Sequence, residues 1–169
     1  MHKEVKIFFE GIKQIHPTYF KNKDVLDCGS FDINGNNRFL FKDCSYTGID
    51  IVKGKNVDVV TKVHAFHPNK QYDIVISSEM LEHDIAYWKS LDNMFELTKP
   101  QGLLVLTAAG EGRKEHGTTN NLPKDSPLTN DYYDNVTVGM LLDGLNLTKF
   151  SWFTISYIEH DIRFAGIKR

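Results

Sequence analysis

The sequence predicts an α/β fold: a doubly wound, mostly parallel sheet with helices on both faces. Two apolar runs, Asp24–Cys28 and Tyr46–Ile51, each contain an acid at or near their end and lead into turn-forming residues. Parallel strands reach a ligand-binding edge in this way. A third run, Leu103–Ala108, is apolar without alternation, which is typical of a central strand buried on both faces. We therefore expect strands and helices to alternate around one open sheet.

Helices are predicted where apolar residues recur at spacings of three and four. The first lies within residues 1–20 and is ended by Pro17. A second includes Asn37–Phe41, and a third is capped by Asp84 and ended by Pro100. The apolar positions of the first and third helices are Val5, Phe8, Ile12, Ile15, Trp88, Leu91 and Phe95.

The remaining elements complete a single domain over residues 1–169. Further strands are expected at Val57–Val63, Tyr72–Ser77, Leu147–Ile155 and Ile162–Ile167, with a last short helix from Val138 to about Gly144. Residues 109–135 are different, because they are rich in glycine, proline and polar side chains without periodicity. This segment follows the carboxyl end of a strand, so we expect a substrate-side loop.

Composition narrows the classes of function. The chain has 169 residues, enough for one sizeable core, and 20 basic against 22 acidic side chains give a net charge of −2. No basic stripe is visible, so a nucleic-acid partner is not expected. The two cysteines form no metal-binding pattern, and no metal is expected. The first residues resemble neither a signal peptide nor a membrane span, which predicts a cytoplasmic protein.

The first two strand ends predict a nucleoside-containing cofactor. Asp50 lies 23 positions after Asp27, and an acid about 20 residues beyond such a turn typically binds the hydroxyls of a ribose. Phe31 stands where a dinucleotide-binding turn has its second glycine, and its bulk opposes close contact with a pyrophosphate. S-adenosyl-L-methionine contains no phosphate and suits this turn. An NAD(P)-dependent oxidoreductase is therefore a minor alternative.

Several motifs follow the two strand ends in a fixed order. They are Ser77-Ser78-Glu79-Met80-Leu81-Glu82-His83, Lys99-Pro100-Gln101-Gly102 and Gly110-Glu111-Gly112-Arg113-Lys114-Glu115-His116-Gly117. With these motifs, residues 24 to 117 resemble the class I S-adenosylmethionine-dependent methyltransferases, and most closely their small type-11 group. The resemblance implies seven strands with the last antiparallel, and a methyl transfer that releases S-adenosyl-L-homocysteine.

The resemblance and the strand ends together assign cofactor-binding residues. These are Asp27, Gly29, Ser30, Phe31, Asn34, Gly35, Asp50, Ile51, Val63, His64, Ser77 and Glu79. One position departs from the family, because Lys62 stands where many relatives have an acid that accepts the adenine amino group. Lysine cannot accept that hydrogen bond, so we expect backbone near Val63 and His64 to contact adenine instead.

The residues of catalysis are less closely defined by the sequence. His116 and His83 are candidates for a general base, although His83 could equally have a structural role in its Leu-Glu-His motif. Arg113, Tyr132 and Tyr133 are expected to bind the acceptor, which we take to be a small molecule or a saccharide. A protein that binds the cofactor without transferring the methyl group is the main alternative.

Overall fold

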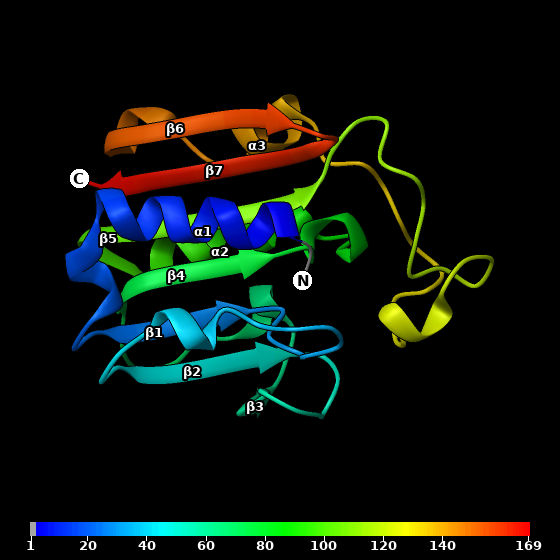
Figure 1. The fold of residues 1–169 in the computed structure, drawn as a ribbon, viewed down its shortest axis with the longest axis horizontal. Helices are drawn as coiled ribbons and strands as arrows, with labels where there is room; N and C mark the ends of the chain where they lie inside the picture. Colours follow the sequence, from blue (N-terminus) through cyan, green and yellow to red (C-terminus); the bar gives the residue numbers. More distant parts are fainter. Residues whose placement is uncertain (1–2) are drawn as a thin grey trace.

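A seven-stranded sheet forms the centre of the structure, a computed structural model that describes residues 3–169. The strand order is β3-β2-β1-β4-β5-β7-β6, and only β7 runs antiparallel to its neighbours (Figure 1). The predicted seven-stranded α/β fold is therefore confirmed. The strands are β1 (Asp24–Cys28), β2 (Ser45–Asp50), β3 (Val59–Val60), β4 (Tyr72–Ser78), β5 (Thr98–Ala109), β6 (Phe150–Ile158) and β7 (Asp161–Lys168).

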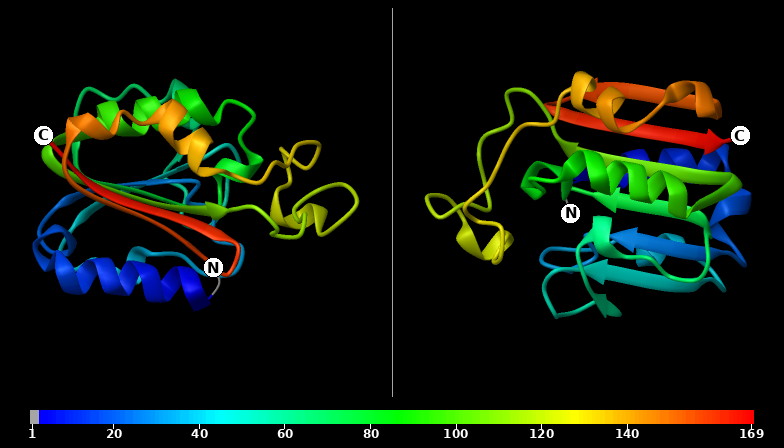
Figure 2. Two further views of the ribbon diagram at one scale, coloured as in Figure 1. Left: turned by 90° about the horizontal axis from the view of Figure 1, so that it is seen from above. Right: turned by 180° about the vertical axis from the view of Figure 1, so that it is seen from behind.

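Helices cover both faces of the sheet, as predicted. Helix α1 (Lys3–Ile15) lies on one face, and α2 (Tyr87–Leu97) and α3 (Val138–Gly144) lie on the other (Figure 2). Successive strand residues point to opposite faces, so the sheet has two apolar cores. Leu26 of β1 packs on the side of α2, whereas Val25 packs on the side of α1.

The prediction of a helix that includes Asn37–Phe41 is wrong. Only a short 3-10 turn forms there, at Arg38–Leu40. Phe41 takes an extended conformation and stacks on Phe20, with ring centroids 5.0 Å apart. This packing directs the chain into β2 before a longer helix can form.

The start and end of α2 also differ from expectation. Ala86 occupies the N-cap position, and Asp84 accepts hydrogen bonds from the Ala86 N–H at 2.9 Å and from the Ser90 hydroxyl. Trp88 is 46% exposed and not part of the buried stripe. Pro100 lies within β5, where the pairing with β4 is irregular, a position at which a strand tolerates proline.

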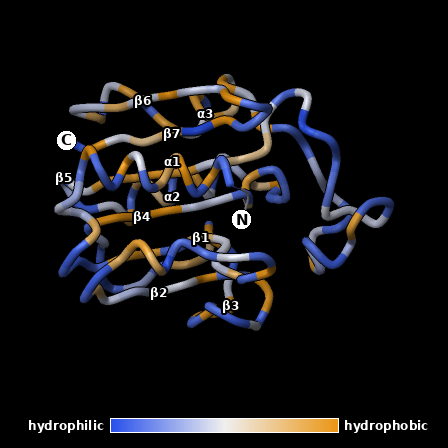
Figure 3. Tube along the Cα trace, in the orientation of Figure 1, coloured by the Kyte–Doolittle hydropathy of each residue, from blue (hydrophilic) through white to orange (hydrophobic). Residues whose placement is uncertain are grey.

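Smaller differences from the prediction concern the length of β3 and which apolar side chains of α1 and α3 are buried. Strand β3 has two residues in place of the seven expected at Val57–Val63. Ile15 of α1 is exposed and Phe9 is buried instead, while Leu141 is the buried apolar residue of α3. In Figure 3 the central strands are largely hydrophobic, whereas residues 109–135 are mainly hydrophilic.

The topology brings three strand ends to one edge. Strand β1 pairs in parallel with both β2 and β4, so the direction in which the sheet is built reverses beside β1. Ligands bind outside the carboxyl ends of strands at such a switch point. Residues 110–135 extend from the same edge (Figure 1). Among the residues described, no helix has the length and apolar character needed to cross a membrane.

Candidate active site

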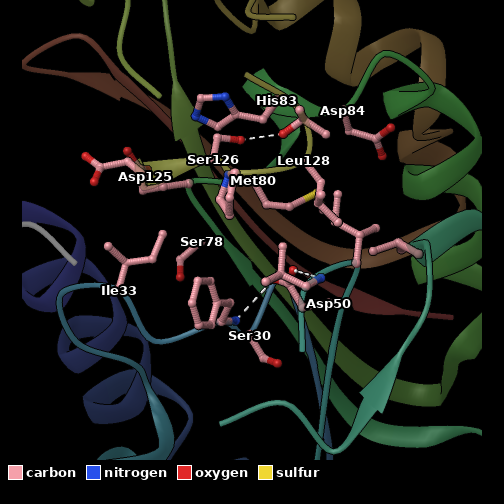
Figure 4. Close-up of a pocket in the computed structure, with 18 of the residues that line it drawn as sticks. Ser30, Ile33, Asp50, Ser78, Met80, His83, Asp84, Asp125, Ser126 and Leu128 are labelled. Atoms are coloured by element: carbon pink, nitrogen blue, oxygen red, sulfur yellow. Dashed lines mark hydrogen bonds between the residues drawn. The ribbon is translucent and has the colours of Figure 1, made fainter. Parts of the chain in front are cut away.

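A cavity of about 1130 Å³ lies between this sheet edge and the loop at 109–135 (Figure 4). Most residues predicted from the sequence line it, including both candidate bases. Ser77 and Tyr133 are not among the lining residues, and Ser77 is fully buried within β4. The predicted residues that line the cavity are Asp27, Gly29, Ser30, Phe31, Asn34, Gly35, Asp50, Ile51, Val63, His64, Glu79, His83, Arg113, His116 and Tyr132.

Gly29 begins the turn after β1, and the structure requires a glycine there. Its φ is +80°, and a Cβ atom at this position would lie 2.6 Å from Cγ of Met80. The close approach leaves backbone exposed to the cavity in place of a side chain. Glu79, which also lines the cavity, has a φ of +54°, a left-handed conformation that is strained for a residue other than glycine.

Asp50 at the end of β2 is held by backbone N–H groups. Its carboxylate accepts hydrogen bonds from Phe31 at 3.1 Å and from Val52 at 2.9 Å. Burial raises the pKa of Asp50, and these N–H groups oppose that shift. Each carboxylate oxygen retains a lone pair, so Asp50 can still accept hydrogen bonds from a diol in the cavity.

Asp27 lies beneath the turn and is almost completely buried. The Tyr46 hydroxyl donates a hydrogen bond to its carboxylate at 2.6 Å. Burial raises the pKa of Asp27 to about 6, because the tyrosine bond only partly offsets the lost solvation. The carboxylate is therefore charged at neutral pH and can attract a cationic group.

Two buried polar atoms beside the turn have no hydrogen-bond partner among the described residues. They are Oγ of Ser30 and Oδ1 of Asn37, and both residues line the cavity. The amide nitrogen of Asn37 donates to Ser78 Oγ at 3.2 Å, which fixes the orientation of the side chain. A hydroxyl and a carbonyl oxygen suit the carboxylate and ammonium groups of an amino acid.

The edge near β3 is formed by a 3-10 turn at Val63–Ala65. The Val63 carbonyl accepts a hydrogen bond from the Asn93 amide at 2.7 Å and another from the Phe66 N–H at 3.1 Å. That carbonyl is therefore already satisfied. His64 and Lys62 line the cavity beside it, with the Lys62 side chain exposed.

His83 and His116 line the opposite wall of the cavity, and Tyr133 packs against both rings from outside the lining. His83, His116 and Tyr133 form a triangle with ring centroids 5.2 to 5.4 Å apart. Burial, followed by the nearby His116, lowers the pKa of His83 to about 4. His83 is therefore neutral at pH 7 and is a weak base.

Two acids lie near this wall: Glu79, which lines the cavity, and the buried Glu82. Burial and then the charge of Asp161 raise the pKa of Glu79 to about 7, and Thr107 donates a hydrogen bond to it at 3.0 Å. Glu82 is completely buried, which raises the pKa of its carboxyl strongly. Backbone N–H groups of Glu82 and Ala109 favour its charged form, but neither reaches hydrogen-bond geometry.

The loop is attached to the wall at its base. Arg113 forms an ion pair with the buried Asp161 at 2.6 Å, so its guanidinium is partly engaged in structure. The Asp134 N–H donates to the Glu82 carbonyl at 2.9 Å, and the Val136 N–H donates to the Ala109 carbonyl at 2.8 Å. These bonds hold both ends of the loop beside the cavity.

The sequence interpretation missed several lining residues, among them Asn37, Ser78, Met80, Ser126 and Leu128. Ser78 directly follows the predicted Ser77, and the alternation of side chains along β4 decides which of the two faces the cavity. Ser126 and Leu128 belong to the long loop and line the cavity together with His83 (Figure 4). Nothing in their local sequence indicates this position, because it depends on the path of the long loop.

Comparisons with known proteins agree with this geometry. Residues 3–166 match a family model described as a methyltransferase domain. The chain belongs to this methyltransferase family. The prediction of a class I methyltransferase is thereby confirmed. A search of curated proteins found no match to the chain.

Solved structures share the fold at low sequence identity. A Burkholderia thailandensis 1,6-didemethyltoxoflavin-N1-methyltransferase, with bound 1,6-didemethyltoxoflavin and S-adenosylhomocysteine, is 17% identical with a TM-score of 0.65, covering 94% of this chain and 75% of that one. The N-methyltransferase NodS from Bradyrhizobium japonicum WM9 is 13% identical with a TM-score of 0.59, and the match covers 95% of this chain and 86% of NodS. A third match is the Haemonchus contortus phosphoethanolamine N-methyltransferase 2 in complex with S-adenosyl-L-methionine. It is 14% identical with a TM-score of 0.67, and the match covers 95% of this chain and 51% of that one.

Proposed function

We propose that this methyltransferase moves the methyl group of S-adenosyl-L-methionine to a small-molecule or saccharide acceptor by direct in-line displacement. One observation carries the proposal: a single cavity joins the turn after β1 and Asp50 to the wall of His83 and His116. Its volume of about 1130 Å³ exceeds the range of roughly 300–1,000 Å³ usual for one ligand. It therefore has room for a cofactor beside an acceptor.

The residues around the turn fit the cofactor. Gly29 would let its methionine part approach the backbone, with Asp27, Ser30 and Asn37 available to its ammonium and carboxylate groups. Asp50 would accept hydrogen bonds from the ribose hydroxyls. Adenine would lie toward His64, because the Val63 carbonyl is already satisfied.

The cofactor supplies an activated methyl group on a sulfonium centre. The protein then needs chiefly to hold the acceptor in line with it, and alignment of this kind can contribute about 7–11 kcal/mol. The loop at 109–135 closes one side of the cavity and offers polar groups to the acceptor. The solved relatives named above include enzymes of small acceptors such as 1,6-didemethyltoxoflavin, which supports an acceptor of that size.

An acceptor with a hydroxyl or ammonium group must also lose a proton. His116 is the better candidate for direct proton removal, since burial lowers the pKa of His83 to about 4. A base of this kind contributes roughly 10²–10⁴-fold to the rate. Tyr133 packs against both histidine rings and orients them.

Incubation with methyl-labelled donor and a metabolite extract tests the proposal. We expect label in an extracted small molecule, and loss of that product in His116→Gln with donor binding unchanged by calorimetry. The control is His67→Gln, an exposed histidine outside the cavity. Donor binding without any labelled product would favour the alternative of a silent cofactor-binding protein, and tighter binding of NADH would favour the oxidoreductase.

A further inference from the structure

The wall opposite the cofactor turn brings three metal-binding types of side chain together. Glu82, His83 and His116 each place one ligand atom within 4.8 Å of the other two. Ligand atoms bound tetrahedrally at 2.0–2.2 Å lie about 3.5 Å apart. Side-chain movements of about 1 Å would therefore bring the three onto one ion.

Glu82 supplies an independent sign of a ligand. Its side chain is 0% exposed, and neither carboxylate oxygen has a hydrogen-bond partner in the described part of the chain. A buried polar group without a partner is costly, and buried charges are normally paired or bound to metals. The Nδ1 atom of the neighbouring His83 is also buried without a partner.

The histidine rings are oriented as metal ligands usually are. His116 Nδ1 lies 3.1 Å from the Lys114 carbonyl, which leaves Nε2 for a ligand. Histidine ligands commonly donate their second ring N–H to a backbone carbonyl, as His116 can. In His83 the buried Nδ1 is the atom left without a partner among the described residues.

We propose that Glu82, His83 and His116 bind a divalent transition metal that also coordinates a hydroxyl oxygen of the acceptor. Two imidazoles and one carboxylate favour Zn²⁺ or a similar ion over Mg²⁺. Three protein ligands leave positions open for substrate oxygen, as in catalytic sites. His83 and His116 border the cavity, so the open side faces the acceptor. This proposal rests on the proposed function, and it makes the acceptor an oxygen nucleophile.

The metal would replace direct proton removal by a histidine. A hydroxyl bound to the ion loses its proton to water at neutral pH, as metal-bound water does. The resulting oxygen anion forms a bond to the methyl carbon. The carbon–sulfur bond breaks, and the electron pair of that bond stays on the sulfur, which becomes an uncharged thioether. A histidine nitrogen that binds the ion cannot accept a proton, so the two roles exclude each other.

Titration of the whole chain with Zn²⁺, and with Co²⁺ as a spectroscopic probe, tests the site. We expect one ion per chain and a Co²⁺ absorption spectrum typical of mixed nitrogen and oxygen ligands. Glu82→Gln and His116→Gln should each weaken binding by about tenfold or more, whereas His67→Gln should leave it unchanged. His116 lies in the loop, so its replacement tests the site even if a change at buried Glu82 affects folding. Adding catechol, a probe with adjacent hydroxyls, should shift the Co²⁺ bands.

The outcomes separate this proposal from the function on which it rests. Donor binding without stoichiometric metal binding, or metal binding equal in His116→Gln and His67→Gln, would overturn the metal site and leave methyl transfer standing. Metal binding without a catechol-induced shift would overturn the role assigned to the acceptor oxygen. A chain that binds Zn²⁺ at these residues but not the donor would contradict the proposed function instead.

Discussion

Replacing Gly29 with alanine tests how the turn after β1 is built. The added Cβ would lie 2.6 Å from Cγ and 2.7 Å from Cβ of Met80. Because Cβ of Met80 is fixed to its backbone, a change of rotamer cannot relieve both contacts. The positive φ costs an alanine about 1–2 kcal/mol. Overpacking of this kind costs about 1–3 kcal/mol more, so the free energy of unfolding should fall by about 2–5 kcal/mol.

Urea unfolding followed by circular dichroism measures this loss, and calorimetry measures donor affinity in the same variant. Gly11→Ala is the matched control, because Gly11 lies in α1 with no atom within 4 Å of an added Cβ. The control should gain about 0.5–1 kcal/mol, since alanine is the better helix former. If Gly29→Ala lost less than about 1 kcal/mol, the argument from close packing against Met80 would be refuted.

Two further predictions concern the acids of the cofactor half. Asp50→Asn should weaken donor binding by about 1.5–3 kcal/mol, roughly 10- to 100-fold in Kd. The reason is the loss of charge-assisted hydrogen bonds from the ribose and from the N–H of Phe31. Calorimetry checks this prediction, and an equal loss in the exposed control Asp43→Asn would contradict it. Donor affinity should also fall as the pH drops below about 6, because burial raises the pKa of Asp27 from 3.8 to about 6 and only its charged form attracts the ammonium group. The raised pKa means that Asp27 favours the folded state most when protonated, so its contribution to stability increases as the pH falls through 6 toward 4, by at most about 3 kcal/mol. Both dependences should vanish in Asp27→Asn, and a flat profile in the wild type would refute this assignment.

The sheet could be predicted because its strands carry their own signal. Buried parallel strands are rich in apolar residues, and that signal places β1, β4 and β5 to within a few residues, except at the start of β5. The more polar β2 is placed by its turn residues and by Asp50 at its end. That start could not be foreseen, because Pro100 enters the strand only where pairing with β4 becomes irregular. The missing helix after β1 has a similar origin, since Phe41 leaves the helical conformation to stack on Phe20. Tertiary packing decided both cases.

The candidate site also has one part that local sequence predicts and one part that depends on tertiary packing. Its cofactor half is local, because a turn and the strand ends beside it bring Gly29, Asp27 and Asp50 to one edge. Its acceptor half joins residues that are far apart in the chain. His83 and His116 are 33 positions apart, and their contact depends on how the loop folds back.

Bonds at the base of the loop connect that acceptor half to the sheet. The Asp134 N–H binds the carbonyl of Glu82, the same residue whose carboxylate lies unpartnered behind the histidines. A change in the path of the loop would therefore move Glu82 and His116 relative to each other, while the turn at Gly29 would stay in place. If the strands hold the donor site and the loop holds the acceptor site, as we propose, the same cofactor can be kept while the acceptor changes with the loop. We therefore predict that substitutions in residues 109–135 that face His83 alter acceptor choice without altering donor affinity.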